Sequence, residues 1–256
     1  MSIGKQGRGF FPNIKLTVSY DGADFAGWEL QPGKRTIRGE IEKALQVIYK
    51  KKITARAVSR TDAGVHALDN VIFFKPPYKI PRESIVKALN ALLPEDLRAL
   101  KAEEQANDKV KGKTYEYLIF NGPIMPPHLR KIAWHVKPKL NLSAMKKAAR
   151  YLVGKHDFSS FCAAGGDDND HVRIIHSLVI GNWSLVIWGK ERVIRIRMAG
   201  NGFLYKMVRN MVGTLVEVGL GRREPESIKK LILAKDRRQA GKTAPGRGLC
   251  LVRINF

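Results

Sequence analysis

The sequence is poor in cysteine, in acidic residues and in long apolar runs, and each shortage excludes a class of protein. Only two of its 256 residues are cysteines. They form neither a disulfide framework nor a zinc-binding pattern, so we expect a reducing compartment, the cytoplasm. No apolar run approaches the length of a membrane span, and the N-terminus lacks the apolar core of a signal peptide, so we expect no membrane association. Because a dinucleotide fingerprint, a phosphate-binding loop and a metal-ligand cluster are all missing, we expect neither a cofactor nor a metal.

Basic residues outnumber acidic ones two to one. The chain has 46 Lys and Arg against 23 Asp and Glu, a formal net charge of +23 at pH 7 and a sequence pI near 10.2. Such an excess suits a polyanionic partner. Nucleic acid is the first candidate, because basic side chains neutralise its phosphates and release counterions. The alternative is a solvated, lysine-rich surface, but surfaces of that kind carry a more balanced charge.

One short loop concentrates polar side chains between two apolar runs. Residues 59–67 read Ser-Arg-Thr-Asp-Ala-Gly-Val-His-Ala, and the runs at 53–58 and 71–74 on either side predict strands. Chemistry is often found on loops held by such a rigid support. Asp62 is the only carboxylate in the loop, and the nearby Arg60 favours its ionised form. An ionised Asp without metal ligands suits a nucleophile or a general base, although Asp before Ala-Gly is also a common turn.

The first half of the chain has the periodicity of a ferredoxin-like unit. Residues 15–20 alternate as a strand, and apolar residues recur at helical spacing over 37–48 and 85–92. With the two strands beside the loop and a further strand at 115–120, this is a split β-α-β layout. It predicts an N-terminal half, residues 13–122, that carries the Asp62 loop.

The second half, residues 123–256, continues the mixed pattern without a sequence repeat. Its predicted elements are helices over 142–152, 203–219 and 225–235 and strands over 172–180, 185–188, 193–198 and 249–254. Residues 1–12 are predicted to form a loose basic arm ahead of both halves. We therefore expect an α/β (α+β) fold of two ferredoxin-like halves, with largely antiparallel mixed sheets and an active-site cleft between them.

Matches to one known family extend from about residue 15 to the C-terminus. Residues 60–67, Arg-Thr-Asp-Ala-Gly-Val-His-Ala, resemble the signature of the TruA family of tRNA pseudouridine synthases. Further segments resemble that family in the same order, at residues 20–32, 39–45, 90–94, 113–117, 156–161, 207–213 and 243–251. Agreement in this order is not expected by chance.

Four features depart from the family pattern. Ser59 stands where the family usually has Gly, and residues 29–30, Glu-Leu, stand where it usually has two polar residues. The stretches 103–110 and 163–170 are also unlike the corresponding family segments. These departures concern RNA docking more than the chemistry.

The resemblance implies isomerisation of uridine to pseudouridine in tRNA. The N1–C1′ bond breaks, the uracil turns, and C5 bonds to C1′. It implies that Asp62 is the essential carboxylate, and attack on C1′, attack on the base and deprotonation of C2′ all stay open as its role. It also implies that Tyr115 packs on the target ring, that Arg209 pairs with the Asp, and that Arg60 helps to displace the target base from the helix stack. On sequence alone, Tyr115 is equally a core aromatic and Arg209 a rim residue whose stem covers the core.

Lys113, Leu249 and Leu251 are the remaining candidates. Lys113 is expected to contact phosphate or to be simply solvated, and the two leucines to line the pocket or to belong to the last core strand. His66 lies in the loop and is either part of the site or a structural residue bonded to backbone.

The family usually modifies uridines 38–40 in the anticodon stem-loop, as a homodimer with tRNA lying across both subunits. The resemblance implies the same for this chain. The alternative is a non-catalytic basic RNA-binding protein or RNA chaperone on the same scaffold. An Asp-dependent glycosidase or phosphotransferase is disfavoured, because the sequence lacks a second well-placed acid and a phosphate loop.

Overall fold

The computed structural model describes residues 13–105, 109–166, 169–186 and 190–256. The basic arm predicted for residues 1–12 lies outside the described residues. The strands are β1 (Ile14–Tyr20), β2 (Arg56–Ala57), β3 (His66–Phe74), β4 (Leu97–Glu104), β5 (Gly112–Phe120), β6 (Trp134–His135), β7 (Gly154–Asp157), β8 (Val172–Val186), β9 (Lys190–Gly200) and β10 (Leu249–Asn255). The helices are α1 (Ile37–Tyr49), α2 (Arg82–Leu92), α3 (Leu142–Arg150), α4 (Met207–Gly219) and α5 (Ser227–Ala234), with single 3-10 turns at Pro127–Leu129, Ser159–Phe161, Arg237–Gln239 and Gly246–Gly248.

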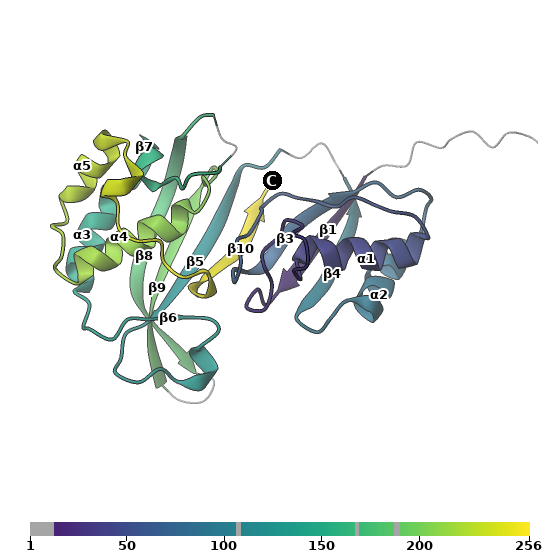
Figure 1. Cartoon of the computed structure of the whole chain (residues 1–256), viewed down its shortest axis with the longest axis horizontal. Helices are drawn as coiled ribbons and strands as arrows, with labels where there is room; N and C mark the ends of the chain where they lie inside the picture. The colour runs from purple at the N-terminus through teal and green to yellow at the C-terminus, as the bar shows by residue number, and fades with distance from the viewer. Residues whose placement is uncertain (1–12, 106–108, 167–168, 187–189) are drawn as a thin grey trace, which may run out of the picture.

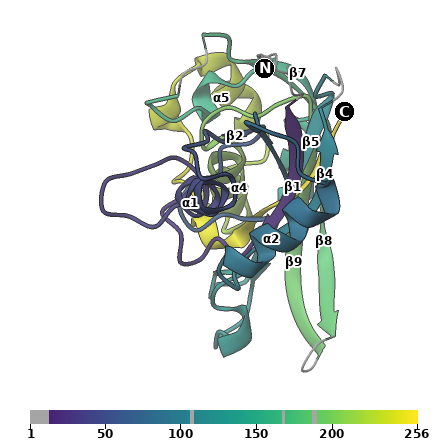
Figure 2. The ribbon, with the colours of Figure 1, turned by 90° about the vertical axis from the view of Figure 1, so that its right-hand side faces the viewer.

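All ten strands belong to one sheet that extends from one end of the molecule to the other (Figure 1). The order is β4-β1-β3-β10-β5-β9-β8-β7, with β2 beside β3 and β6 beside β5. Only the β10–β3 and β5–β6 pairs are parallel among the described strands. Helices α1, α4 and α5 lie on one side of this sheet (Figure 2). The expected mixed α/β fold with largely antiparallel strands is therefore confirmed.

The last strand of the chain joins the two halves. β10 lies between β3, which follows the Asp62 loop, and β5, which carries Tyr115. Leu251 is opposite Ala67 on one side and opposite Tyr115 on the other. The sequence predicted that residues 115–120 complete the N-terminal half. In the structure that strand is separated from the N-terminal strands by β10, which no local pattern reveals.

Helix α1 shows how local sequence sets the elements around the loop. The hydroxyl of Thr36 accepts a hydrogen bond from the backbone N–H of Gly39 and caps the first turn. The buried positions Ile37, Ile41, Ala44, Leu45 and Tyr49 recur at helical spacing and face the sheet. Lys50 adopts a left-handed conformation and ends the helix.

One large cluster of buried apolar side chains runs through both halves. It includes Trp28 and Ile41 from the N-terminal part and Tyr117, Met211 and Leu251 from the rest of the chain. A small satellite cluster forms around Phe120 beneath the loops near β6. Burial of one large apolar side chain contributes about 1.5–3 kcal/mol, so the shared cluster holds the halves in one arrangement. No helix among the described residues is long and apolar enough to cross a membrane.

The structure corrects several sequence-based element predictions. The run at 53–58 is a strand only at Arg56–Ala57, and three further corrections have clear physical reasons. β4 was not predicted, because it is a charged edge strand and a bulge opposite β1 between residues 99 and 101 breaks its alternation. The predicted strands at 172–180 and 185–188 are largely one strand, β8, because residues 181–184 also pair with β9. Residues 187–188 of that prediction lie outside the described residues.

The third correction concerns α4, which begins at Met207 and not at Phe203. Lys206 has a positive φ of 56°, which the right-handed helix does not allow. The residues before it are therefore not helical, although their apolar side chains continue the helical spacing.

Close packing beneath α4 predicts a large stability loss for Gly213→Ala. A Cβ at Gly213 would lie 1.7 Å from the carbonyl oxygen of Lys242, so α4 or the segment leading to β10 must move. We expect a loss of about 3 kcal/mol in the free energy of unfolding, near the upper end for overpacking, measured by urea titration. Gly181→Ala is the matched control, because a Cβ there meets no atom within 4 Å. An equal loss in both variants would contradict the packing of this segment against α4.

Candidate active site

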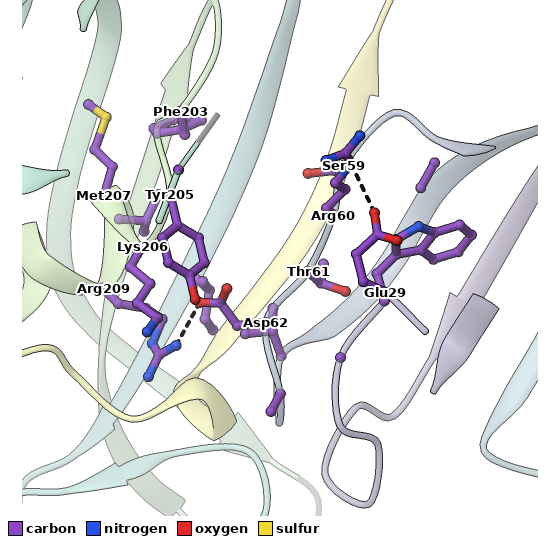
Figure 3. Close-up of a pocket in the computed structure, with 18 of the residues that line it drawn as sticks. Glu29, Ser59, Arg60, Thr61, Asp62, Phe203, Tyr205, Lys206, Met207 and Arg209 are labelled. Atoms are coloured by element: carbon purple, nitrogen blue, oxygen red, sulfur yellow. Dashed lines mark hydrogen bonds and ion pairs between the residues drawn. The ribbon is translucent and has the colours of Figure 1, made fainter. Parts of the chain in front are cut away.

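A pocket with a volume of about 1020 Å³ opens where the two halves meet. Its walls come from residues 26–34 before α1, from the Asp62 loop, from β5, and from residues 203–209 at the start of α4. Figure 3 shows these residues converging from opposite sides of the pocket. The volume is ample for one nucleotide and its neighbours, since pockets for drug-sized ligands reach about 300–1,000 Å³.

An ion pair crosses the pocket between the two halves. The Oδ2 atom of Asp62 lies 2.6 Å from Nη1 of Arg209, as the dashed line in Figure 3 marks. The side chains are only 16% and 15% exposed, so water screens the pair weakly. The Nε atom of Arg209 also donates to the carbonyl of Ala244 at 2.7 Å, which fixes the plane of the guanidinium.

Buried hydrogen bonds position the loop from below. The hydroxyl of Thr61 lies 2.8 Å from that of Tyr20, and the side-chain amide of Asn70 donates to the Tyr20 hydroxyl at 3.0 Å. The same amide donates to the carbonyl of Ser59 at 2.9 Å. All four side chains are less than 8% exposed. The loop is thus attached on both sides of residue 60, so that Asp62 has a defined direction.

The segment before β10 packs directly on the loop. Gly246 has no room for a Cβ, which would lie 2.3 Å from the carbonyl oxygen of Ala63. The hydroxyl of Tyr117 donates to the carbonyl of Pro245 at 2.7 Å. This close approach explains why glycine stands at position 246.

His66 has a structural place. Its Nδ1 accepts from the backbone N–H of Gly22 at 3.1 Å, and its Nε2 lies 3.0 Å and 3.1 Å from the carbonyl oxygens of Lys131 and Arg247. The imidazole thereby ties the end of the loop to three other segments. It does not line the pocket, which agrees with the structural alternative stated for this residue.

Tyr115 lines the pocket beside Asp62. Its hydroxyl lies 2.6 Å from the hydroxyl of Ser59, and its ring meets Phe203 edge-on, with centroids 5.2 Å apart. Burial raises the pKa of the Tyr115 hydroxyl to about 12, with the hydrogen bond from Ser59 lowering it and the charge of Asp62 adding to the rise. The side chain is therefore a neutral phenol at physiological pH.

Lys113 also lines the pocket and attaches to the loop. Its Nζ atom donates to the carbonyl of Val58 at 2.8 Å and lies 3.5 Å from the hydroxyl of Ser59. Leu249 lines the pocket as well, whereas Leu251 does not. Leu251 is fully buried and belongs to the apolar cluster of the core, although it shares a face of β10 with Leu249.

Arg60 points away from Asp62. Its side chain is 65% exposed, and its Nε lies 3.1 Å from Glu29 on the opposite side of the loop from Arg209 (Figure 3). Glu29 also pairs with Arg38 at 3.1 Å. The cation that contacts Asp62 is therefore Arg209, and not Arg60 as the spacing alone predicted.

Sequence reasoning missed several residues of the site. Asn70 lies in a strand and gave no motif, although a lone Asn inside an apolar strand signals a buried hydrogen-bond network. Tyr20 was noted only as part of the family-like segment 20–32. Tyr205 and Lys206 line the pocket but were assigned to a helix. Glu29 was noted as a departure without a role.

Among the described residues, no group of three or more His, Cys, Asp or Glu side chains could hold a metal ion. The pocket instead offers the weakly exposed carboxylate of Asp62 paired with Arg209, the neutral phenol of Tyr115, and at its edge the carboxylate of Glu29 together with several cations. This set suits nucleophilic or acid–base chemistry on a bound polyanion.

Comparisons with known proteins agree with this geometry. A family model described as tRNA pseudouridine synthase matches residues 16–110 and 148–256. A "tRNA pseudouridine synthase A" from Bacillus licheniformis is 46% identical over 250 residues, covering 95% of this chain and 98% of the relative. The proteins of the same name from Bacillus subtilis and Moorella thermoacetica are 43% and 42% identical, covering 95% and 96% of this chain and 98% and 100% of the relatives.

These matches confirm the resemblance seen in the sequence motifs, over nearly the full length of the chain and of its relatives. The chain belongs to the tRNA pseudouridine synthase A (TruA) family of isomerases.

Proposed function

We propose that the protein converts uridine to pseudouridine in the anticodon stem-loop of tRNA, at positions 38–40. Asp62 acts as the essential carboxylate on a base flipped out of the RNA. The observation that carries the proposal is the placement of Asp62, paired with Arg209, in a pocket built by both halves. The anticodon positions rest on the family resemblance.

The isomerisation needs few groups beyond those that line this pocket. The reaction breaks the N1–C1′ bond, forms a C5–C1′ bond, removes the proton from C5 and adds one at N1. All of this takes place within one nucleotide, so no external oxidant, reductant or acceptor takes part. The base must leave the helix stack to reach Asp62, at a cost of about a few kcal/mol. Arg209 orients the carboxylate, and the Tyr115 ring supplies an apolar face for the flipped uracil.

Arg60 also has a role in the proposed reaction. Its exposed guanidinium stands at the mouth of the pocket and forms a surface ion pair with Glu29. Exposed pairs of this kind contribute about 0–1 kcal/mol. RNA phosphate therefore competes readily with Glu29 for Arg60, and the planar side chain can stack in the space that the flipped base vacates.

The alternative, a non-catalytic RNA-binding protein or RNA chaperone, is not favoured. RNA binding needs exposed cations and aromatic rings, but not a carboxylate held inside the pocket by an internal Arg. An Asp that faces RNA phosphates weakens binding, so its retention with Arg209 and Tyr115 points to chemistry.

The first test is pseudouridine mapping on tRNA with wild-type protein and Asp62→Asn. We expect wild type to form pseudouridine in the anticodon arm without added cofactor. The variant should be at least about a thousandfold slower, because an amide cannot act as nucleophile or base, while its tRNA affinity stays within about twofold.

Asp69→Asn is the matched control, since Asp69 lies on β3 outside the pocket and should keep full activity. Tight tRNA binding by wild type with no pseudouridine would favour the RNA-binding alternative.

The charge excess predicts salt-sensitive binding. With a formal net charge of +23, the protein should neutralise several phosphates and release their counterions. The affinity of Asp62→Asn for tRNA, which binds without turnover, should fall about a hundredfold or more between 50 and 200 mM salt. Affinity that does not change with salt would refute the electrostatic part of the proposal.

We also propose that the protein acts as a homodimer in the cytoplasm, with one tRNA across both subunits. The family resemblance supports this, and one 28.7 kDa chain offers limited surface to an L-shaped tRNA. Light scattering at micromolar concentration should give twice the mass of the chain. The mass of a single chain, with full activity, would contradict the dimer.

A further inference from the structure

Ser59 has a buried hydroxyl to which the proposed reaction assigns no role. Its side chain is 3% exposed, and its Oγ lies 2.6 Å from the hydroxyl oxygen of Tyr115. A buried hydroxyl aimed at a pocket residue calls for a physical account.

Ser59 itself is held from two sides. The side-chain amide of Asn70, which is fully buried, donates to the Ser59 carbonyl at 2.9 Å. On the other side, Lys113 donates to the carbonyl of Val58 at 2.8 Å, and its ammonium lies 3.5 Å from the Ser59 hydroxyl. The backbone that carries this hydroxyl therefore cannot drift.

Tyr115 needs such an anchor at the far end of its ring. Its backbone is fixed in β5, opposite Leu251 of β10 and Met198 of β9. Phe203 meets the ring edge-on, but it comes from the non-helical residues before α4. The hydrogen bond between Ser59 and Tyr115 is the polar contact at the hydroxyl end of the ring, and it holds that end in place in the pocket.

We propose that Ser59 is a positioning residue for the isomerisation, acting through Tyr115. By fixing the hydroxyl end, it holds the aromatic ring at the angle at which a flipped uracil packs on it. The proposal rests on the proposed function, because it needs a base in this pocket. The competing interpretation is that the bond only satisfies two buried hydroxyls and contributes to stability alone.

The experiment compares Ser59→Ala with wild type in single-turnover pseudouridine formation on tRNA. We expect the maximal rate to fall about three- to tenfold, the effect of one lost hydrogen bond, while the tRNA dissociation constant stays within about twofold. Ser59→Gly should show the same loss. Ser177→Ala, an exposed serine on β8, is the control and should change neither quantity.

A second measurement tests the contact itself without requiring activity. In urea unfolding, Ser59→Ala and Tyr115→Phe should each lower the urea midpoint. The double variant should lower it no further than the less stable of the two single variants does. Losses that do not add are the signature of one shared interaction.

Two results would overturn the proposal. One is an unchanged maximal rate in folded Ser59→Ala, which would leave the hydroxyl a stability role only. The other is additive unfolding losses, which would show that Ser59 does not act through Tyr115. A wild-type protein that binds tRNA but forms no pseudouridine would overturn the proposed function and this proposal together. An active wild type with either result above would overturn this proposal alone.

Discussion

The structure depends most on the ion pair between Asp62 and Arg209, whose residues are 147 positions apart in the chain. A carboxylate that is only 16% exposed is costly to hold without a nearby counter-ion. The pair therefore requires the loop and the first turn of α4 to face each other, with Oδ2 of Asp62 2.6 Å from Nη1 of Arg209. The continuous sheet, the shared apolar cluster and the hydrogen bond from Arg209 to Ala244 all help to hold Asp62 and Arg209 at this distance.

The strand that brings the two sides together is β10, the last element of the chain. A two-half fold with separate sheets would leave Asp62 and Tyr115 on surfaces free to shift against each other. Because β10 hydrogen-bonds to β3 and to β5, the distance between the loop and Tyr115 is set by one strand's width, about 4.7–4.9 Å on each side. This explains why the residues before β10 pack so tightly, with Gly246 against Ala63. The position of the Asp62 loop therefore depends on residues near the other end of the chain.

Much of this could be predicted from sequence, and the remainder has identifiable causes. Periodicity located α1 and β1, because their buried faces repeat regularly. The motifs pointed to Asp62, Tyr115 and Arg209, and the structure brings these side chains to one pocket. Other predictions failed where a long-range or backbone effect decided the outcome. A bulge interrupts the alternation of β4, and the left-handed conformation of Lys206 makes α4 begin later than the apolar spacing predicts. Arg60 pairs with Glu29 and points away from Asp62. Asn70 has no motif at all, since its partners Tyr20 and Ser59 come from other segments.

The buried polar network beneath the loop explains why this fold has hydroxyls and amides in its core. Among the described residues, the Oδ1 atom of Asn70 is buried without a hydrogen-bond partner, which typically costs about 1–3 kcal/mol. An apolar side chain at the same place would avoid that cost and pack as well, so stability alone does not account for Asn70. What an apolar side chain cannot do is donate to both Tyr20 and the Ser59 carbonyl. These two bonds set the loop direction on either side of Arg60. Burial of Asn70 costs free energy, and the orientation of Asp62 and Tyr115 accounts for that cost. Functional sites retain strained backbone and buried polar groups for the same reason.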